Sequence, residues 1–418
     1  MKVLVVGGGG REHAIIYKLN QSPAVSKILC APGNGGISEI AQCFDVKASD
    51  IDGQCRLALE QKVDFVVVAP DDPLALGLVD RITALGIPAF GPTAAAAEIE
   101  SSKSFAKGLM RKYGIPTADY AVFSEMDDAL KYVRSKGAPI VVKCDGLALG
   151  KGVVVCHTIS EAEEAVTSMM SDGIFGDSGN TVVIEEYMTG PEVTVLCFSD
   201  GKTLLAMPSS QDHKRAYDGD MGPNTGGMGS ISPSPFYTPE IERRCLEEIF
   251  IPTLRAMEQE GRPFKGVLYF GLMLTADGPK VIEYNARFGD PETQAVLVRL
   301  ESDLFEIMSA VVEGTLENVK VKWSPKAACC VVLASGGYPA GYKTGYKISG
   351  LENSSGIIFH AGTKKIVDGS YVTAGGRVLG ITALGDTLND AVGAAYEAVQ
   401  PISFEAMHFR RDIGKLKE

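Results

Sequence analysis

The chain has 418 residues, of which 45% are hydrophobic and 22% are charged, and its formal net charge is −12 at pH 7. This length predicts about two to four domains, and the acidic balance excludes a global positive field that would recruit nucleic acid. No apolar run approaches the roughly 20 residues of a membrane-spanning helix, and the nine cysteines contain no Cys-x-x-Cys spacing. We therefore expect a cytoplasmic protein with reduced thiols and no membrane partner.

Short apolar strands at 2–6, 27–31 and 63–69 alternate with helical stretches near the N-terminus. This alternation predicts a parallel sheet whose ligand lies beyond the carboxyl ends of the strands. The residues that follow the three strands are the candidates for that ligand site, and they include Gly8, Gly9, Gly10, Asn34, Gly35, Asp71 and Pro73.

Glycines between a strand and a helix let the backbone approach a phosphate group at the positive end of the helix. A dinucleotide-binding domain normally ends its second strand on an acidic residue that holds the ribose hydroxyls. Here the second strand ends in the loop 32–36, which reads Pro-Gly-Asn-Gly-Gly. The loop favours a small phosphorylated ligand, and a tight turn without a ligand is the alternative.

Residues 94–114 are predicted as one helix that carries Lys103 and Lys107 at i, i+4 spacing. Taken alone, that spacing favours a solvated helix face over a ligand site. A strand at 139–144 then brings Lys143 into the segment 145–152, which reads DGLALGKG. A glycine-rich loop between lysines can close over a triphosphate with backbone N–H groups and point charges, although it lacks the spacing of a P-loop.

The strand predicted at 181–187 ends in two carboxylates, Glu185 and Glu186, which could hold an adenine amino group. Glu192 follows at a place suited to ribose hydroxyls, although each glutamate taken singly is more typical of the surface. The polar, glycine-rich segment 209–229 contains Asp212 and Lys214. Loops of that length inside a compact region are usually functional or disordered, and its charge density favours a substrate loop.

Strands at 266–275 and 279–285 are expected to pair, and the second leads into VIEYNARFGDPETQ at 281–294. Because side chains alternate along a strand, Glu283, Asn285 and Arg287 should project on one side. Carboxylate and amide oxygens suit Mg²⁺ that carries phosphates, and an arginine can bind a phosphoryl oxygen. The alternative is a solvated edge strand followed by a turn.

Beyond this stretch we predict a helix at 291–314. The remainder, 326–418, reads as short strands with one helix, and it contains no evident catalytic constellation.

Several blocks carry a family resemblance from end to end: VLVVGGGGREHA, APGNGG, FGPTAAAAEIESSKSFAK, VVKCDGLALGKGV, VVIEEY, SSQDHKRAYDGDMGPNTGGMG, KVIEYNARFGDPETQ and TAGGRVLGITALG. With them the chain resembles the phosphoribosylamine–glycine ligases, or glycinamide ribonucleotide synthetases, of the ATP-grasp superfamily. The resemblance implies an α/β and α+β multidomain fold. A Rossmann-like N-terminal domain would span 1–101, a central ATP-grasp domain 102–324 with a lid subdomain at about 120–190, and a small β-rich C-terminal domain 325–418.

The resemblance also implies the reaction. ATP would drive the joining of glycine to 5-phospho-D-ribosylamine through glycyl phosphate, giving N1-(5-phospho-D-ribosyl)glycinamide, ADP and phosphate, the second step of de novo purine biosynthesis. The implied cofactors are ATP and Mg²⁺ or Mn²⁺. The implied partners are the two small substrates, without nucleic acid, and the resemblance allows a monomer.

Carried over residue by residue, the family's contacts fall on four groups. The nucleotide contacts would be Lys103, Lys143, Gly146, Leu147, Ala148, Gly150, Lys151, Gly152, Glu185, Glu186, Tyr187 and Glu192. The metal ligands would be Glu283 and Asn285, and the catalytic residues would be Arg287, Asp212 and Lys214. The substrate contacts would be Gly8, Gly9, Gly10, Asn34, Gly35, Asp71, Pro73, Asn224, Thr225, Gly226 and Asp290.

Asp71 departs from the family pattern, because it stands where a glutamate, one methylene longer, is common. Three other hypotheses stay open at this point: an ATP-grasp ligase for another carboxylate, a nicotinamide-dependent oxidoreductase built on the N-terminal sheet, and a non-catalytic nucleotide sensor. An assay of which acid and amine release ADP, and a test of NAD(P)H binding, would separate them.

Overall fold

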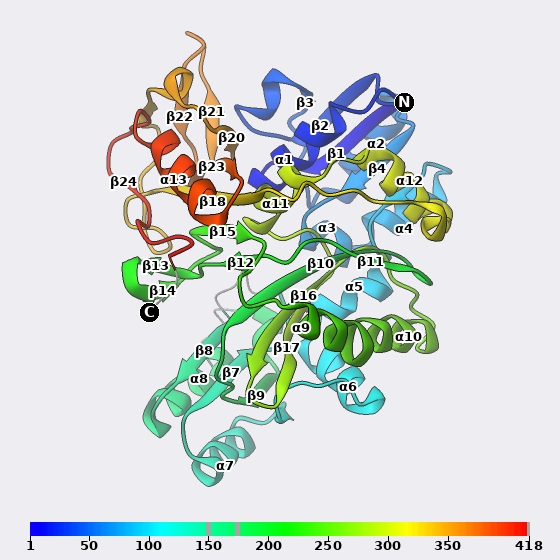
Figure 1. Cartoon of the computed structure of the whole chain (residues 1–418). Coiled ribbons are helices and arrows are strands. Elements are labelled where there is room, and N and C mark those ends of the chain that lie inside the picture. The colour runs from blue at the N-terminus through cyan, green and yellow to red at the C-terminus, as the bar shows by residue number, and fades with distance from the viewer. Residues whose placement is uncertain (148–151, 172–175, 416–418) are drawn as a thin grey trace.

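The computed structural model describes residues 1–147, 152–171 and 176–415. In this part of the chain, four sheets of four or more strands surround the middle of the molecule, and two smaller sheets lie outside them (Figure 1). In the described residues, no helix combines the length and the apolar composition needed to cross a membrane.

The N-terminal sheet is parallel, as predicted, with the strand order β3-β2-β1-β4-β5. Its central strand is buried almost throughout, because helices cover both faces of a parallel sheet. The strands are β1 (Lys2–Gly7), β2 (Lys27–Pro32), β3 (Gln42–Cys43), β4 (Phe65–Val68) and β5 (Ala89–Phe90). The helices between them are α1 (Gly10–Leu19), α2 (Ile51–Glu60), α3 (Asp71–Ala75) and α4 (Leu78–Ala84).

The central sheet is antiparallel with the order β11-β10-β16-β17. Its last two strands are the pair predicted from the sequence, and Tyr269 lies opposite Asn285 in their register. The strands are β10 (Glu192–Asp200), β11 (Leu204–Ala206), β16 (Lys265–Thr275) and β17 (Gly278–Asn285). The helices of this region are α5 (Ala94–Ser101), α6 (Lys103–Tyr113), α9 (Pro239–Cys245), α10 (Ile251–Gln259), α11 (Glu292–Val296) and α12 (Leu304–Glu313).

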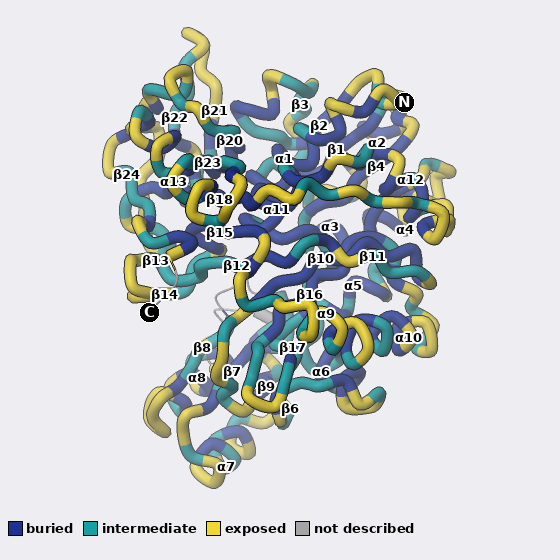
Figure 2. Tube along the Cα trace, viewed as in Figure 1, coloured by how far each residue is buried: buried dark blue, intermediate teal, exposed yellow. Residues whose placement is uncertain are grey.

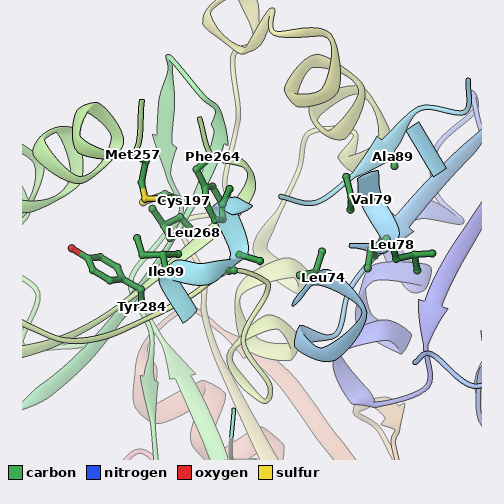
Figure 3. Packing of buried hydrophobic residues seen from close by; sticks show 14 of the residues in the cluster. Leu74, Leu78, Val79, Ala89, Ile99, Cys197, Met257, Phe264, Leu268 and Tyr284 are labelled. Atoms are coloured by element: carbon green, nitrogen blue, oxygen red, sulfur yellow. The ribbon is translucent and has the colours of Figure 1, made fainter. Parts of the chain in front are cut away.

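One hydrophobic core joins the N-terminal sheet and its helices to the central sheet (Figure 3). It includes Leu74 and Leu78 from the N-terminal region and Leu268 and Tyr284 from the central strands, all of them buried. A second core also contains side chains of both sheets, such as those of Val5 and Leu196. Because burial of apolar surface is the main stabilising contribution to folding, these shared cores fix the two sheets against each other.

A small antiparallel sheet with the order β6-β9-β7-β8 projects from the body with its own core. Its strands are β6 (Tyr120–Phe123), β7 (Ile140–Cys144), β8 (Val153–Cys156) and β9 (Val182–Glu186), and its helices are α7 (Met126–Lys136) and α8 (Ile159–Ser171). Figure 2 shows that its strands are more buried than the outer turns of α7. The strand β7 brings Lys143 to the side of the sheet that faces the body.

The C-terminal sheet recruits two strands from within the range 102–324. These are β12 (Gln211–Asp212) and β15 (Gly229–Ser232), which join β18 (Ala327–Ser335), β20 (Ile357–His360), β23 (Arg377–Gly385) and β24 (Met407–His408). The helix α13 (Leu388–Val399) packs on this sheet. The remaining strands form a hairpin of β13 (Arg215–Tyr217) and β14 (Met221–Asn224), and a small sheet of β19 (Lys347–Ile348), β21 (Thr363–Lys365) and β22 (Tyr371–Thr373).

Two predicted helices are divided in the structure. The helix expected at 94–114 breaks at Ser102, whose backbone is extended and whose hydroxyl accepts a hydrogen bond from the Phe105 N–H as an N-cap of α6. The helix expected at 291–314 becomes α11, one 3-10 turn and α12, with Asp303 capping α12. The predictions were wrong here because apolar periodicity continues through a break that a capping side chain stabilises.

The segment predicted as a long loop, 209–229, is partly ordered into β12, β13 and β14. Its first residues pair with both the central sheet and the C-terminal sheet, since Ser210 bridges Thr194 of β10 and Gln211 lies opposite Ile231 of β15. The segment is therefore held between the central and C-terminal sheets.

Candidate active site

A cavity of about 1200 Å³ lies between the four larger sheets. Its walls come from α6, β7, β9, β10, β17, the 209–229 segment and the C-terminal region. The sequence-predicted residues among its lining are Lys103, Lys143, Leu147, Gly152, Glu185, Glu186, Tyr187, Glu192, Asp212, Lys214, Asn224, Thr225, Gly226, Glu283, Asn285, Arg287, Asp71 and Asp290. The structure thus brings most of the predicted side chains together in one place.

A buried cluster of two lysines and one glutamate forms one wall of the cavity. The Glu185 carboxylate lies 2.9 Å from the Lys143 ammonium through one oxygen and 2.9 Å from the Lys107 ammonium through the other. Burial, together with the charge of Lys143, lowers the pKa of Lys107 to about 8. The expectation of a solvated face was wrong for Lys107, because a carboxylate from a distant strand compensates its burial.

Glu185 therefore forms ion pairs with the two lysines. We expected its carboxylate to contact an adenine amino group, but both of its oxygens are engaged by ammonium groups. Glu186 and Tyr187, which follow it, and Glu192, which begins β10, line the cavity with side chains at least partly accessible.

The N-terminus of α6 meets the glycine-rich segment. Lys103 Nζ donates a hydrogen bond of 2.9 Å to the Gly146 carbonyl, and the Ser104 N–H donates to the Asp145 carboxylate. A Cβ at Gly146 would lie 2.0 Å from Ser178 Oγ, so a side chain has no room there. The predicted nucleotide contacts Ala148, Gly150 and Lys151 lie outside the described residues.

Glu283, Asn285 and Arg287 project together, as the alternation of a strand predicts. Arg287 Nη2 donates to Asn285 Oδ1 over 3.0 Å, and Lys214 Nζ lies 3.4 Å from Glu283 Oε1 and 3.4 Å from Glu192 Oε2. The nearby Lys214 lowers the pKa of Glu283 to about 2 against the opposing effect of burial, so this carboxylate is ionised at neutral pH.

The donor set of Glu283 and Asn285 fits a hard divalent cation. Both offer oxygen atoms, which Mg²⁺ and Mn²⁺ prefer. Within the described ranges, no group of three or more His, Cys, Asp or Glu residues could hold a metal ion by itself. A cation at this place would therefore need phosphate or water oxygens to complete its shell, which suits an ion that arrives with a nucleotide.

Arg287 is also surrounded by acidic groups. Its Nη2 lies 2.9 Å from Glu100 Oε1 and 4.0 Å from Asp71 Oδ2. Burial raises the pKa of Glu100, whereas Arg287 and Arg11 lower the pKa of Asp71 although burial opposes them. Glu100 was not among the predicted site residues, and it stands in the last turn of α5.

A second acidic pair lies deeper. Glu292 Oε1 accepts a hydrogen bond of 2.8 Å from the Tyr269 hydroxyl. Burial, and then the charge of Glu292, raise the pKa of Asp212 well above its usual value. The sequence places Glu292 near the start of the helix predicted at 291–314, and nothing local marks it as buried.

The C-terminal region contributes an arginine. Arg377 Nη2 lies 3.3 Å from Asp290 Oδ2, and Nη1 donates to the Asp290 carbonyl over 2.7 Å and to the Gly226 carbonyl. The hydroxyl of Tyr338 accepts a hydrogen bond from the Gly226 N–H. The sequence of 326–418 shows no evident catalytic constellation, yet the pairing of β23 with β18 brings Arg377 from this region to the cavity.

The predicted contacts of the N-terminal sheet are only partly at the cavity. Among the described residues that line it, Gly8, Gly9, Gly10, Asn34, Gly35 and Pro73 do not appear. The Asn34 amide donates to the Gly8 carbonyl over 3.0 Å and to the His360 carbonyl over 2.7 Å. Asn34 thus joins the glycine loop to the C-terminal sheet.

The chain matches known proteins over almost its whole length. Residues 1–100, 101–293 and 328–416 match the N domain, the ATP-grasp (A) domain and the C domain of phosphoribosylglycinamide synthetase. The phosphoribosylamine–glycine ligase of Xanthomonas campestris pv. campestris is 51% identical, over 99% of this chain and 97% of that protein. The enzyme of the same name from Caldanaerobacter subterraneus subsp. tengcongensis is 48% identical, over 99% of both chains.

Solved structures agree with these matches. The crystal structure of phosphoribosylamine–glycine ligase from Thermotoga maritima has a TM-score of 0.87 at 33% identity and covers 99% of this chain and 100% of that one. The biotin carboxylase domain of Hydrogenobacter thermophilus 2-oxoglutarate carboxylase, solved with MgADP, has a TM-score of 0.76 at 15% identity and covers 97% and 91%. At that identity the likeness shows the fold alone.

Proposed function

This chain belongs to the phosphoribosylglycinamide synthetase family and has its three-part ATP-grasp fold, and from that premise we propose its activity. The protein is an ATP-dependent phosphoribosylamine–glycine ligase. It joins glycine to 5-phospho-D-ribosylamine through glycyl phosphate and releases N1-(5-phospho-D-ribosyl)glycinamide, ADP and phosphate.

One observation supports the proposal most strongly. The lysines of α6 and β7 line the same cavity as the Glu283–Asn285–Arg287 face of β17. Such a cavity offers positive charge for phosphates at one wall and hard oxygen donors with a guanidinium at another. It suits a reaction in which the protein mainly positions a triphosphate and neutralises charge.

The nucleotide end is assigned to the wall built by the small sheet. Lys103 and Lys143 would bind the phosphates, together with the described residues Gly146, Leu147 and Gly152 of the glycine-rich segment. Glu186 and Tyr187 would contact the base, Tyr187 through its backbone, and Glu192 would contact the ribose. Glu185 would act by holding Lys143.

Glu283 and Asn285 would hold Mg²⁺ or Mn²⁺. When bound, the cation would neutralise charge on the phosphates and orient them for transfer. The chain's own residues supply the rest, because Lys214 and Arg287 place two further positive charges beside the same carboxylate and amide.

The acyl-transfer end is assigned to Arg287 and the 209–229 segment. The glycine carboxylate would attack the γ-phosphate, and Arg287 would steady the transferring phosphoryl group. Asp212, Lys214, Asn224, Thr225 and Gly226 would line the pocket for glycine and glycyl phosphate. No protein nucleophile is needed, since the acyl phosphate already carries a good leaving group.

Phosphoribosylamine is assigned to the side of the N-terminal sheet. Asp71 and Asp290 are two of the predicted substrate residues that line the cavity, and Arg377 holds Asp290 in place. The other predicted substrate residues of the N-terminal region would support this wall from outside the cavity. They are Gly8, Gly9, Gly10, Asn34, Gly35 and Pro73. The shorter side chain of Asp71 leaves Arg287 at 4.0 Å, while Glu100 provides its close carboxylate partner.

We also propose the domain limits 1–101, 102–324 and 325–418, a monomeric state, a cytoplasmic location and the absence of a nucleic-acid partner. The net charge of −12 supports the last of these.

The test is an ADP-release assay in which each substrate is omitted in turn. We expect ADP formation only with glycine and phosphoribosylamine together. Equal turnover without either one would contradict the proposal, and turnover with a different acid or amine would assign the chain to another ATP-grasp reaction.

A further inference from the structure

Lys107 is not among the residues assigned above to the nucleotide, the metal or the substrates, and yet its side chain is buried. It lies one helical turn after Lys103 on α6, and its side chain is 3% exposed. A buried ammonium is costly unless it is paired, so its contacts indicate what it does.

Those contacts, with the ones that continue from them, join five segments of the chain. Lys107 Nζ lies 2.9 Å from Glu185 Oε2 on β9 and donates a hydrogen bond of 2.8 Å to Thr117 Oγ1, in the linker 114–119 between α6 and β6. The Thr117 hydroxyl donates in turn to the Val281 carbonyl on β17 over 2.7 Å. The other oxygen of Glu185 holds Lys143, whose Nζ also donates to the Ile282 carbonyl over 3.2 Å.

These contacts therefore connect the small sheet to the rest of the molecule, here called the body, at two places: Lys107 pairs with Glu185, and Lys143 donates to Ile282. Glu185 and Lys143 belong to the small sheet, whereas Lys107, Val281 and Ile282 belong to the body. A single carboxylate cannot hold Lys143 in one place unless its own position is fixed, and Lys107 fixes it from the body side.

We propose that Lys107 is a positioning residue for nucleotide binding: by holding Glu185 and Thr117 it sets where Lys143 lies above β17. The inference rests on the proposed nucleotide site and adds to it a residue that does not touch the nucleotide. The result is a small sheet whose phosphate-binding lysine is fixed relative to the strand that carries Glu283.

The direct test is Lys107→Met, which keeps the length of the side chain and removes its charge. Lys112→Met is the matched control, because Lys112 lies on the same helix with a side chain that is 63% exposed. Calorimetry with a non-hydrolysable ATP analogue and Mg²⁺ should show about a tenfold loss of affinity for Lys107→Met and no change for the control. Thr117→Val removes the hydrogen bond that Lys107 donates and the one that reaches Val281, but it keeps the pairing of Lys107 with Glu185, so it should show a smaller loss.

A pH series separates positioning from simple stability. The groups that face Lys107 are Glu185 and Glu186 on β9, Lys143 on β7 and the ring of Tyr120 on β6. Because burial lowers the pKa of Lys107 to about 8, the affinity of the unaltered protein should fall as the pH rises above that value. Lys107→Met should lose this part of the pH dependence.

Two results would overturn the inference. One is wild-type affinity and pH dependence in Lys107→Met. The other is a variant with a lowered melting temperature but unchanged affinity, which would make Lys107 a structural residue only. If Lys107→Met does not fold, the affinity of Thr117→Val and the pH series of the unaltered protein decide. Analogue binding needs neither glycine nor phosphoribosylamine, so a failed ligase assay with intact binding would contradict the reaction and leave the inference standing.

Discussion

Substitution of Glu283 by glutamine should separate the metal from the rest of the site. The change keeps the shape and one oxygen of the side chain and removes its negative charge. Glu283 is ionised, with a pKa of about 2, chiefly because of Lys214. The substitution therefore exchanges the charged one of the two proposed metal ligands for a neutral amide and leaves Lys214 with Glu192 as its acidic partner at 3.4 Å.

The expected effects of the substitution on stability and on metal affinity differ in size. Unit charges about 4 Å apart interact by about 4 kcal/mol at an effective dielectric constant near 20 and by about 1 kcal/mol in water. Both side chains are about one third exposed, at 34% and 33%, and Glu192 remains, so we expect the free energy of unfolding to fall by about 1 kcal/mol. Loss of a metal-binding contact costs at least about tenfold in metal affinity.

The assay is ADP release at saturating ATP, glycine and phosphoribosylamine over a range of free Mg²⁺. We expect Glu283→Gln to need at least about ten times more Mg²⁺ than the unaltered protein, with little change in melting temperature. Glu260→Gln is the control, since Glu260 also pairs with a lysine, Lys112, at 2.5 Å but outside the cavity. Unchanged activity of Glu283→Gln at limiting Mg²⁺ would refute the metal role.

Three further predictions concern packing and ionisation. Gly146→Ala should raise the KM for ATP, because its Cβ would lie 2.0 Å from Ser178 Oγ; an unchanged KM would show that the loop adjusts freely. Glu292→Gln should move the acidic limb of the pH–rate profile to lower pH, since Glu292 helps to raise the pKa of Asp212; an unmoved limb would show that Asp212 does not control it. Burial lowers the pKa of His360 to about 4 from 6.5, so its contribution to the free energy of unfolding is complete above pH 6.5 and falls by about 2 kcal/mol by pH 5. His360→Gln should remove that part of the pH dependence in denaturant titrations, and an identical pH dependence would contradict the assignment.

The parts of the fold that follow local patterns could be predicted from the sequence. The strands of the N-terminal sheet are continuous apolar runs, which are typical of a parallel sheet buried on both faces. The one-sided face of Glu283, Asn285 and Arg287 depends on the two-residue period of a strand, and neither signal needs knowledge of the partner strands. The break at Ser102 also depends on the local sequence. A serine that caps a new helix, however, cannot be distinguished by sequence from a serine that is tolerated inside one continuous helix. Its capping role becomes visible only in the backbone angles.

The missed residues share a different cause. All four are charged: Lys107 and Glu292 are buried, and Glu100 and Arg377 are partly buried, because each meets a partner from a distant segment. Composition and spacing predict a solvated position for each of them, since isolated charges are costly to bury. Which charges meet across the molecule is decided by the packing of whole sheets, and a single sequence does not contain that signal.

The most direct test of the proposed reaction follows an oxygen atom. If the glycine carboxylate attacks the γ-phosphate and the amine then displaces phosphate, glycine labelled with oxygen-18 in its carboxylate should pass one labelled oxygen to each phosphate released. The product amide should keep the other. Unlabelled phosphate formed together with the glycinamide product would contradict the glycyl phosphate intermediate, and with it the central claim about this site.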